Sequence, residues 1–253
     1  MSSHFAAMGI PLEEDTFERV IDTAVAGAGG QVTPWRAPYA TLSWADRSGA
    51  GIDLLFRAED NALSLHCAVP QFAGTASQRV RVTGFVSNDS DADPCPGCTT
   101  LRVEVLDEAG EMVYPLVVAA AGTLPRWDAL AAAIESGAPQ PASLVFVAEE
   151  ATGWADAASY EADQGEPPYA AAESLIPVGM FGGMSAAARV TGTVLHVRER
   201  TTAAFGVPFL DLRLRTFGGE YDVVGAPGTL PAGVAAGQTL RVDAWVCGRV
   251  GTP

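Results

Sequence analysis

The sequence predicts a mainly β protein with few helices, organised around two copies of one small β-module. The main observation is an internal repeat. One copy begins at Arg81 and the other at Arg189, both with Arg-Val-Thr-Gly, and both end in Gly-Thr-Leu-Pro, at Pro125 and Pro231. Short runs rich in Val, Leu and Thr also alternate with turn residues, which is typical of strands. Only two segments show the apolar spacing of a helix.

Residues 1–78 are expected to form a helix followed by a strand meander. The helix is predicted over residues 12–26, where apolar residues recur at helical spacing behind an acidic first turn. Gly27, Gly29 and Gly30 end it. Three β-rich runs separated by turns follow between Tyr39 and Val69. This segment therefore predicts an amphipathic helix packed on about three strands.

The two modules are expected to span residues 79–150 and 188–253, with about five strands each. The first contains a short predicted helix at residues 127–134, before its last strand, and the second has only a loop there. An acidic arm, residues 151–187, connects them. Because long structureless loops are uncommon in compact domains, most of this arm is expected to pack, and residues 173–181 could cross the first module.

Each module resembles an OB-fold barrel. The resemblance rests on five expected strands, a long first loop, and a helix or loop before a late strand. Gly84 and Gly192 lie in the first strand, where a barrel of this kind bends sharply. It covers a little over half of the chain and includes no functional motif. What it implies is a binding face on the second and third strands, for oligonucleotide, oligosaccharide or protein, or a purely structural role.

The charge of the chain favours a basic protein as partner over nucleic acid. The 253 residues carry 30 acidic and 15 basic side chains, a net charge of −15, and all the bases are Arg. From Arg189 onward, seven Arg and five acids give +2, so the residues before it carry −17. This charge disfavours broad electrostatic binding to the phosphates of a nucleic acid. The acidic first half suits a basic protein surface, and plain solubility is the alternative.

An anionic ligand remains a second hypothesis, located in the second module. Alternation in residues 210–215 turns Arg213 and Arg215 to one face, and Arg198 and Arg200 are expected in the loop before them, close to His196. These five residues are the candidate ligand-binding set. The alternative is an ordinary solvated strand face on which the Arg residues pair with Glu199, Asp211 and Glu220, and the overall charge favours that alternative.

Catalytic and metal chemistry has little support in the sequence. Cys95 and Cys98 form a C-x-x-C motif without the second pair of a structural zinc site, so a half-site, a local disulfide or inert thiols all stay open. We expect no cofactor. A third hypothesis is an enzyme with a site between the N-terminal meander and the first module, near His66, for which no nucleophile and base can be assembled.

The expected location is cytoplasmic. No apolar run approaches the roughly 20 residues that cross a bilayer. The first residues have no basic region ahead of an apolar core, as a secretion signal would. The leading prediction is therefore a non-enzymatic cytoplasmic binding protein, with no membrane contact.

Overall fold

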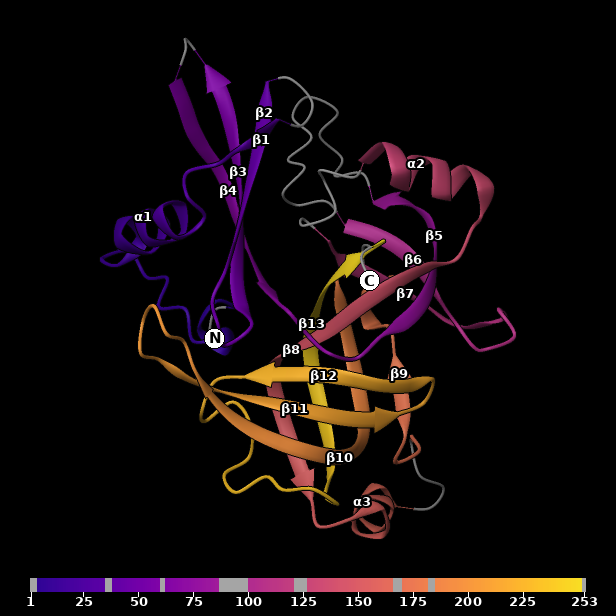
Figure 1. Ribbon diagram of the computed structural model, residues 1–253. Coiled ribbons are helices and arrows are strands. Elements are labelled where there is room, and N and C mark those ends of the chain that lie inside the picture. Colours follow the sequence, from indigo (N-terminus) through magenta and orange to yellow (C-terminus); the bar gives the residue numbers. More distant parts are fainter. Residues whose placement is uncertain are drawn as a thin grey trace.

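The structure is a computed structural model that describes residues 4–34, 38–59, 62–86, 100–120, 127–165, 170–181 and 185–251. It confirms a mainly β chain with few helices. The strands form a four-stranded sheet in the N-terminal part and a nine-stranded sheet in the rest. In Figure 1 the smaller sheet lies at the upper left, and the long strands of the larger sheet run from the upper right to the lower part of the molecule.

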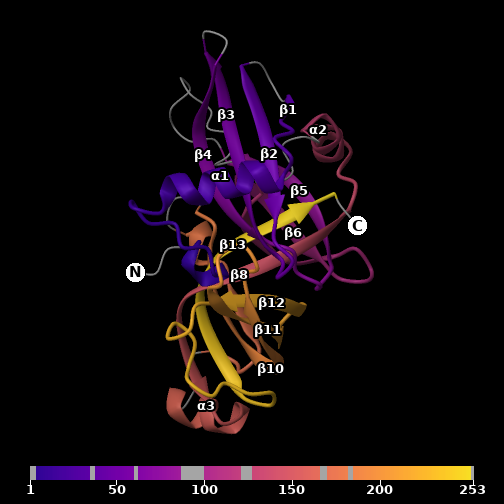
Figure 2. The same cartoon turned by 60° about the vertical axis from the view of Figure 1, so that its left-hand side comes forward.

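The N-terminal part follows the prediction closely. A short 3-10 turn, η1 (Ala6–Met8), precedes helix α1 (Phe17–Gly27), which begins later than predicted because residues 14–16 form a turn. The sheet has the order β1 (Thr33–Pro34), β2 (Tyr39–Ala45), β3 (Ala50–Glu59) and β4 (Ala62–Phe72), all antiparallel. Helix α1 lies across this sheet (Figure 2) and packs Val20 and Ala24 into the core.

The first module contains β5 (Gln78–Val86), β6 (Thr100–Leu106), β7 (Met112–Ala119), helix α2 (Trp127–Ser136) and β8 (Gln140–Trp154). The second contains β10 (Ala187–Thr201), β11 (Pro208–Thr216), β12 (Gly219–Gly225) and β13 (Thr239–Val250). The helix expected before the last strand of the first module is confirmed as α2. The described part of each module therefore holds four strands, one fewer than expected.

Each module obtains its fifth strand from the other. Strands β5, β6, β7, β13 and β8 pair in that order, and β8 pairs back to β5; we call this set ring 1. Strands β10, β11, β12, β8 and β13 pair in the same way, and β13 pairs back to β10; we call this set ring 2. The long strands β8 and β13 belong to both rings and pair with each other over residues 142–154 and 239–250.

The connecting arm packs against both modules. It forms helix α3 (Ala157–Gln164), strand β9 (Ser174–Ile176) and the 3-10 turn η4 (Val178–Met180). Asp156 caps α3 by accepting a hydrogen bond from the Ser159 amide at 2.8 Å. Strand β9 adds to ring 2 by pairing with β10, whereas η4 contacts β7 of ring 1. The arm thus packs where it is described, as expected, but within residues 173–181 strand β9 joins ring 2 and only η4 contacts the first module.

Two apolar cores result from the alternation of side chains in β8, β11 and β12. Leu144, Phe146 and Leu212 point into the rings and join one core with both modules. Val145, Phe209 and Val224 point outward, into a second core with η1, α1 and the four-stranded sheet. The outer face of ring 2 is therefore covered in part by the N-terminal part of the chain.

None of the described helices has the length and apolar character needed to span a membrane.

Candidate functional site

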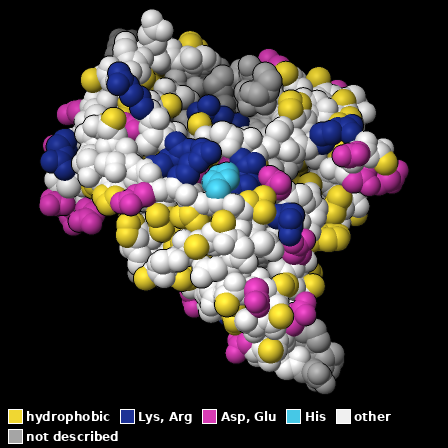
Figure 3. Space-filling view, turned by 60° about the horizontal axis from the view of Figure 1, so that its bottom comes forward, with side chains coloured by type: hydrophobic (Ala, Val, Ile, Leu, Met, Phe, Trp, Pro, Cys, Tyr) yellow, Lys and Arg dark blue, Asp and Glu magenta, His cyan; other side chains and the backbone are white. Residues whose placement is uncertain are grey.

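The five candidate ligand-binding residues lie together on one face of β10 and β11. In the register of these strands His196 is opposite Arg213, Arg198 is opposite Asp211, and Arg200 is opposite Phe209. Arg215 follows Arg213 on the same face because side chains alternate along a strand. On the face shown in Figure 3, a His side chain lies among Arg side chains, with Asp and Glu side chains beside them.

One detail of the prediction is wrong. His196, Arg198 and Arg200 belong to β10 itself, which runs to Thr201, and not to a loop. The loop is short because Thr202 closes it: the Thr202 amide donates to the Val207 carbonyl at 3.1 Å, and the Gly206 amide donates to the Thr202 carbonyl at 2.8 Å. The strand position holds the three side chains at fixed spacing on one surface.

Arg200 is engaged inside the protein. Its guanidinium forms an ion pair with Asp211 at 2.7 Å, and only 4% of the Asp211 side chain is exposed. It also donates to the Ser48 carbonyl at 3.1 Å and lies 5.6 Å from the centre of the Phe72 ring. Ser48 and Phe72 belong to the N-terminal part of the chain, so Arg200 connects ring 2 to it.

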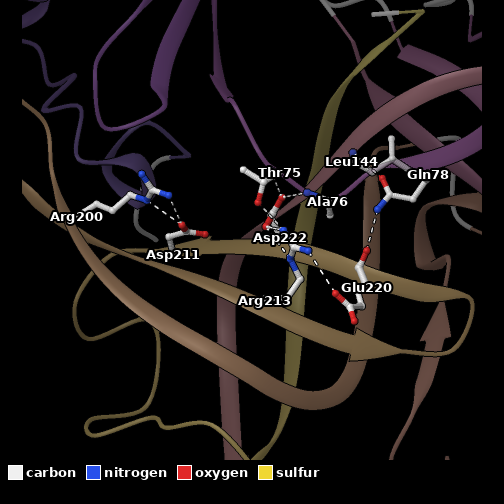
Figure 4. Close-up of polar contacts among 9 residues, drawn as sticks. All are labelled: Thr75, Ala76, Gln78, Leu144, Arg200, Asp211, Arg213, Glu220 and Asp222. Atoms are coloured by element: carbon white, nitrogen blue, oxygen red, sulfur yellow. Dashed lines mark hydrogen bonds and ion pairs between the residues drawn. The ribbon is translucent and has the colours of Figure 1, made fainter. Parts of the chain in front are cut away.

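Arg213 of the neighbouring strand β11 has the same role (Figure 4). It pairs with Asp222 at 3.0 Å and with Glu220 at 3.3 Å, and it donates to the Thr75 hydroxyl at 2.5 Å. The Asp222 carboxylate also accepts hydrogen bonds from the amides of Thr75 and Ala76, at 2.6 and 2.7 Å. These bonds fix the segment between β4 and β5 to β12.

Close packing surrounds this carboxylate. A methyl group at Gly74 would come within 2.4 Å of an Asp222 oxygen, so this position needs a residue without a side chain. Asp222 is 2% exposed and Arg213 supplies the cation that a buried carboxylate requires. The cluster is a polar connection between two parts of the protein.

The remaining candidates are more open. Arg215 pairs with Glu173 of the connecting arm at 3.0 Å, and half of its side chain is exposed. Arg198 is exposed and His196 is half-buried, and neither side chain has a hydrogen bond or ion pair with another residue in the described part of the chain. The expected pairing of Arg with Asp211 and Glu220 is present, whereas Glu199 has no Arg partner within the described residues. Of the five candidates, Arg198 and His196 have side chains that could contact a ligand.

A second buried polar group lies near the C-terminal end of β13. Asp53 of β3 is 7% exposed and accepts hydrogen bonds from the Ser43 hydroxyl at 2.5 Å and the Gln71 amide group at 2.8 Å. Arg249 of β13 lies nearby and donates to the Gln71 side-chain oxygen at 2.7 Å. Burial raises the pKa of Asp53 to about 6, against the opposing effect of the Ser43 bond and the Arg249 charge. Burial likewise raises the pKa of Cys247 to about 12, so this thiol is unreactive at neutral pH.

Two clefts lined entirely by described residues bear on the candidate functions. One, of about 440 Å³, lies between ring 1 and ring 2 and is lined by residues 77–79, 105–108, Val113 and 218–220. The other, of about 460 Å³, is lined by residues 151–153 and 228–232. Neither cleft includes His66, the histidine considered for an enzyme site.

The candidate metal site lies outside the part of the chain that the structure describes. Cys95 and Cys98 lie outside the described residues, and the part of the chain that is described holds no cluster of three or more His, Cys, Asp or Glu side chains suited to a metal ion.

Sequence reasoning missed the partners that define the face. Asp222, Thr75, Ser48 and Glu173 bind the candidate Arg residues, and all except Asp222 come from elsewhere in the fold. Thr75 and Arg213 are 138 positions apart, so no local pattern signals their contact. Asp222 could have been found, because it lies opposite Arg213 in a hairpin closed by a Gly-Gly turn.

No family model matches this chain, and neither the curated proteins nor the solved structures compared with it include a match.

Proposed function

We propose that the chain is a non-enzymatic binding protein and that its partner is a basic protein. The observation that supports this is an imbalance in ion pairing. Exposed carboxylates without an ion pair within the described residues are Glu13, Glu14, Asp15, Glu18, Asp22, Asp107, Glu108, Glu111, Asp128, Glu135, Glu150, Asp156, Glu161, Asp163 and Glu199. Exposed Arg residues without a carboxylate partner within the described residues are fewer: Arg19, Arg47, Arg79, Arg102 and Arg198. The unpaired surface charge is therefore strongly negative.

These acids gather in particular segments. Residues 13–22 at the start of α1 hold five of them with only Arg19 as a base, and residues 107–111 form an acidic turn between β6 and β7. Residues 149–163 hold a further group. On the face shown in Figure 3 the Asp and Glu side chains form separate groups. The proposed contact is therefore one or more of these segments and not one continuous acidic surface.

We infer further that the rings are two OB-like modules that arose from one duplicated ancestor. The pairing order supports this: in each module the first strand pairs with the second, the second with the third, and the fourth with the first. The third strand of each also pairs in parallel with the last strand of the other, which closes both rings in the same way. Modules of this kind commonly bind ligands without catalysis.

The proposal is tested by chemical cross-linking of the full chain in cells of its native host, followed by mass spectrometry. We expect a partner with an excess of Lys and Arg, whose binding to the purified protein weakens as salt rises from about 50 to 300 mM, because salt screens exposed charges. Changing Glu13, Glu14, Asp15 and Glu18 to the corresponding amides should weaken binding of the partner at any given salt concentration. An acidic partner, or binding that is indifferent to salt, would contradict the proposal.

A second candidate function is supported by Arg198 and His196. Both project from β10 on the face of ring 2, and neither has a partner in the described structure, so an anionic ligand could contact them. A single-stranded oligonucleotide titrated at low salt is the test. Binding that is lost in the double variant Arg198→Ala/His196→Ala would support this function, and a flat titration with the natural protein would remove it.

A further inference from the structure

The cleft between the two rings has an apolar floor. Val105 and Leu106 are buried at the end of β6, and Val113 is half-buried at the start of β7. Large apolar side chains stay exposed close by: Met112 precedes Val113 and is 53% exposed, and Phe217 precedes the lining residue Gly218 and is also 53% exposed. An apolar floor with exposed apolar neighbours is suited to an apolar side chain of a partner.

The walls of the cleft are held in place. The Gln78 amide group donates to the Glu220 carbonyl at 2.8 Å, and its oxygen accepts from the Leu144 amide at 3.0 Å, so β5, β12 and β8 are joined at this point (Figure 4). On the opposite side Phe217 lies 6.3 Å from Tyr114, ring centre to ring centre. The cleft is therefore formed before any partner arrives, which lowers the entropic cost of binding.

The rim of the cleft is negative. Asp107 and Glu108 are exposed there, and Glu220 is exposed as well but pairs with Arg213. Arg79 is the only base among the lining residues. The Arg79 guanidinium donates to the backbone carbonyl of Glu108, at 3.1 Å, and the Glu108 carboxylate has no ion pair within the described residues. Asp107 has no ion pair within the described residues, and its carboxylate accepts only the Glu111 amide, at 2.9 Å.

We propose that this cleft is the docking site for an extended segment of the basic partner. One apolar side chain of that segment fills the floor beside Val113, and an adjacent Arg or Lys reaches the carboxylates of Asp107 and Glu108. The argument for this occupant is charge complementarity, and the inference rests on the proposed function, whose acidic turn between β6 and β7 forms one side of the cleft.

The test uses the full chain labelled with ¹⁵N and the peptide acetyl-Arg-Phe-Arg-amide as probe. Amide shifts in the nuclear magnetic resonance spectrum should concentrate at residues 105–113 and 217–220. The peptide acetyl-Glu-Phe-Glu-amide reverses the charge and acetyl-Arg-Ser-Arg-amide removes the apolar side chain, and each should bind at least threefold more weakly. Shifts spread evenly over the surface, or equal binding of all three peptides, would overturn the proposal.

Variants separate the cleft from general acidity. Asp107→Asn/Glu108→Gln should weaken the probe about three- to tenfold, because two exposed charge contacts are lost. Asp128→Asn/Glu135→Gln removes the same charge from α2, outside the cleft lining, and should leave affinity unchanged. If both variants weaken binding equally, the cleft is not the site.

The proposed function can survive failure of this inference. A basic partner that binds normally to Asp107→Asn/Glu108→Gln would overturn the docking site and leave the binding function in place. Failure to find any basic partner would remove the function, whereas specific probe shifts at the cleft would still be observed if the site exists. Shifts at the cleft that grow with protein concentration in the absence of peptide would instead assign it to a second copy of this chain.

Discussion

Two carboxylates bind the same guanidinium in very different surroundings. Asp222 and Glu220 both pair with Arg213, but 2% of the Asp222 side chain is exposed compared with 50% for Glu220. Asp222 also accepts two backbone amides from the segment between β4 and β5. Removing the charge of a buried, hydrogen-bonded partner costs far more than removing an exposed one.

We therefore expect Asp222→Asn to lower the free energy of unfolding by about 3–5 kcal/mol, because Arg213 is left without its buried counter-charge. Glu220→Gln, which removes the other partner of the same guanidinium, should cost less than about 1 kcal/mol. Urea denaturation of both variants measures the difference. Equal losses would mean that the Asp222 cluster does not stabilise the contact between ring 2 and the N-terminal part.

Asp53 predicts how stability depends on pH. Its pKa is about 6 in the folded protein and 3.8 without the fold, so the folded state holds the proton more tightly. The stability from this group is complete below pH 3.8 and is lost as the pH rises through 6, a difference of about 3 kcal/mol. Arg249 and Cys247 of β13 are the other titratable groups beside it. Asp53→Asn should flatten the decline between about pH 4 and 6 in urea denaturation, and an unchanged slope would contradict this.

At the scale of strands, the two Gly residues of the repeat have different roles. A methyl group at Gly192 of β10 would come within 2.2 Å of the Arg215 carbonyl oxygen, which is backbone and cannot move aside easily. At the equivalent Gly84 of β5 the nearest atom is a guanidinium nitrogen of Arg102, at 3.5 Å, an ordinary contact. Only the second copy therefore requires Gly for close approach.

The matched variants follow from these distances. Gly192→Ala should destabilise the protein by about 1–3 kcal/mol, because β10 and β11 must separate to admit the methyl group. Gly84→Ala should be neutral or stabilise by up to about 1 kcal/mol, since Ala restricts the unfolded chain more than Gly does. Thermal unfolding of the two proteins tests the pair. Similar losses in both would show that β5 bends as tightly as β10.

For the whole molecule, the shared strands predict cooperative unfolding. Strands β8 and β13 pair with each other and belong to both rings, and the rings share one core that includes Leu101 and Leu214. Neither ring can lose these strands without opening the other. We expect the whole molecule to unfold in one transition. Leu101→Ala in ring 1 and Leu214→Ala in ring 2 should each lower the free energy of unfolding for that transition by about 2–5 kcal/mol.

Calorimetry measures this cooperativity, because a two-state protein has equal calorimetric and van't Hoff enthalpies. Hydrogen exchange adds a local measurement: strands of both rings should lose protection together in either variant. A variant that loses protection only in its own ring would show that the rings unfold independently.

The sequence by itself determined many of the elements and the order in which they follow one another. The meander of residues 39–69, the helix before β8 and the strands on either side of each repeated turn all appear where alternation and turn residues placed them. It also placed His196, Arg198, Arg200, Arg213 and Arg215 near one another, since a hairpin brings its two strands together whatever the rest of the chain does. These features depend on neighbours within about 20 residues, so local patterns specify them.

Only the tertiary structure decided how those elements combine. No local signal indicates that the two rings share β8 and β13, or that the N-terminal part covers ring 2. The same is true of the contact between Thr75 and Asp222, which are 147 positions apart. Each of these contacts depends on which apolar faces of the strands pack together. Many strands with the same alternation of apolar and polar residues could pack there equally well, so the pattern does not select one arrangement. Arg200 and Arg213 therefore became internal contacts for a reason that lies outside the strands that carry them.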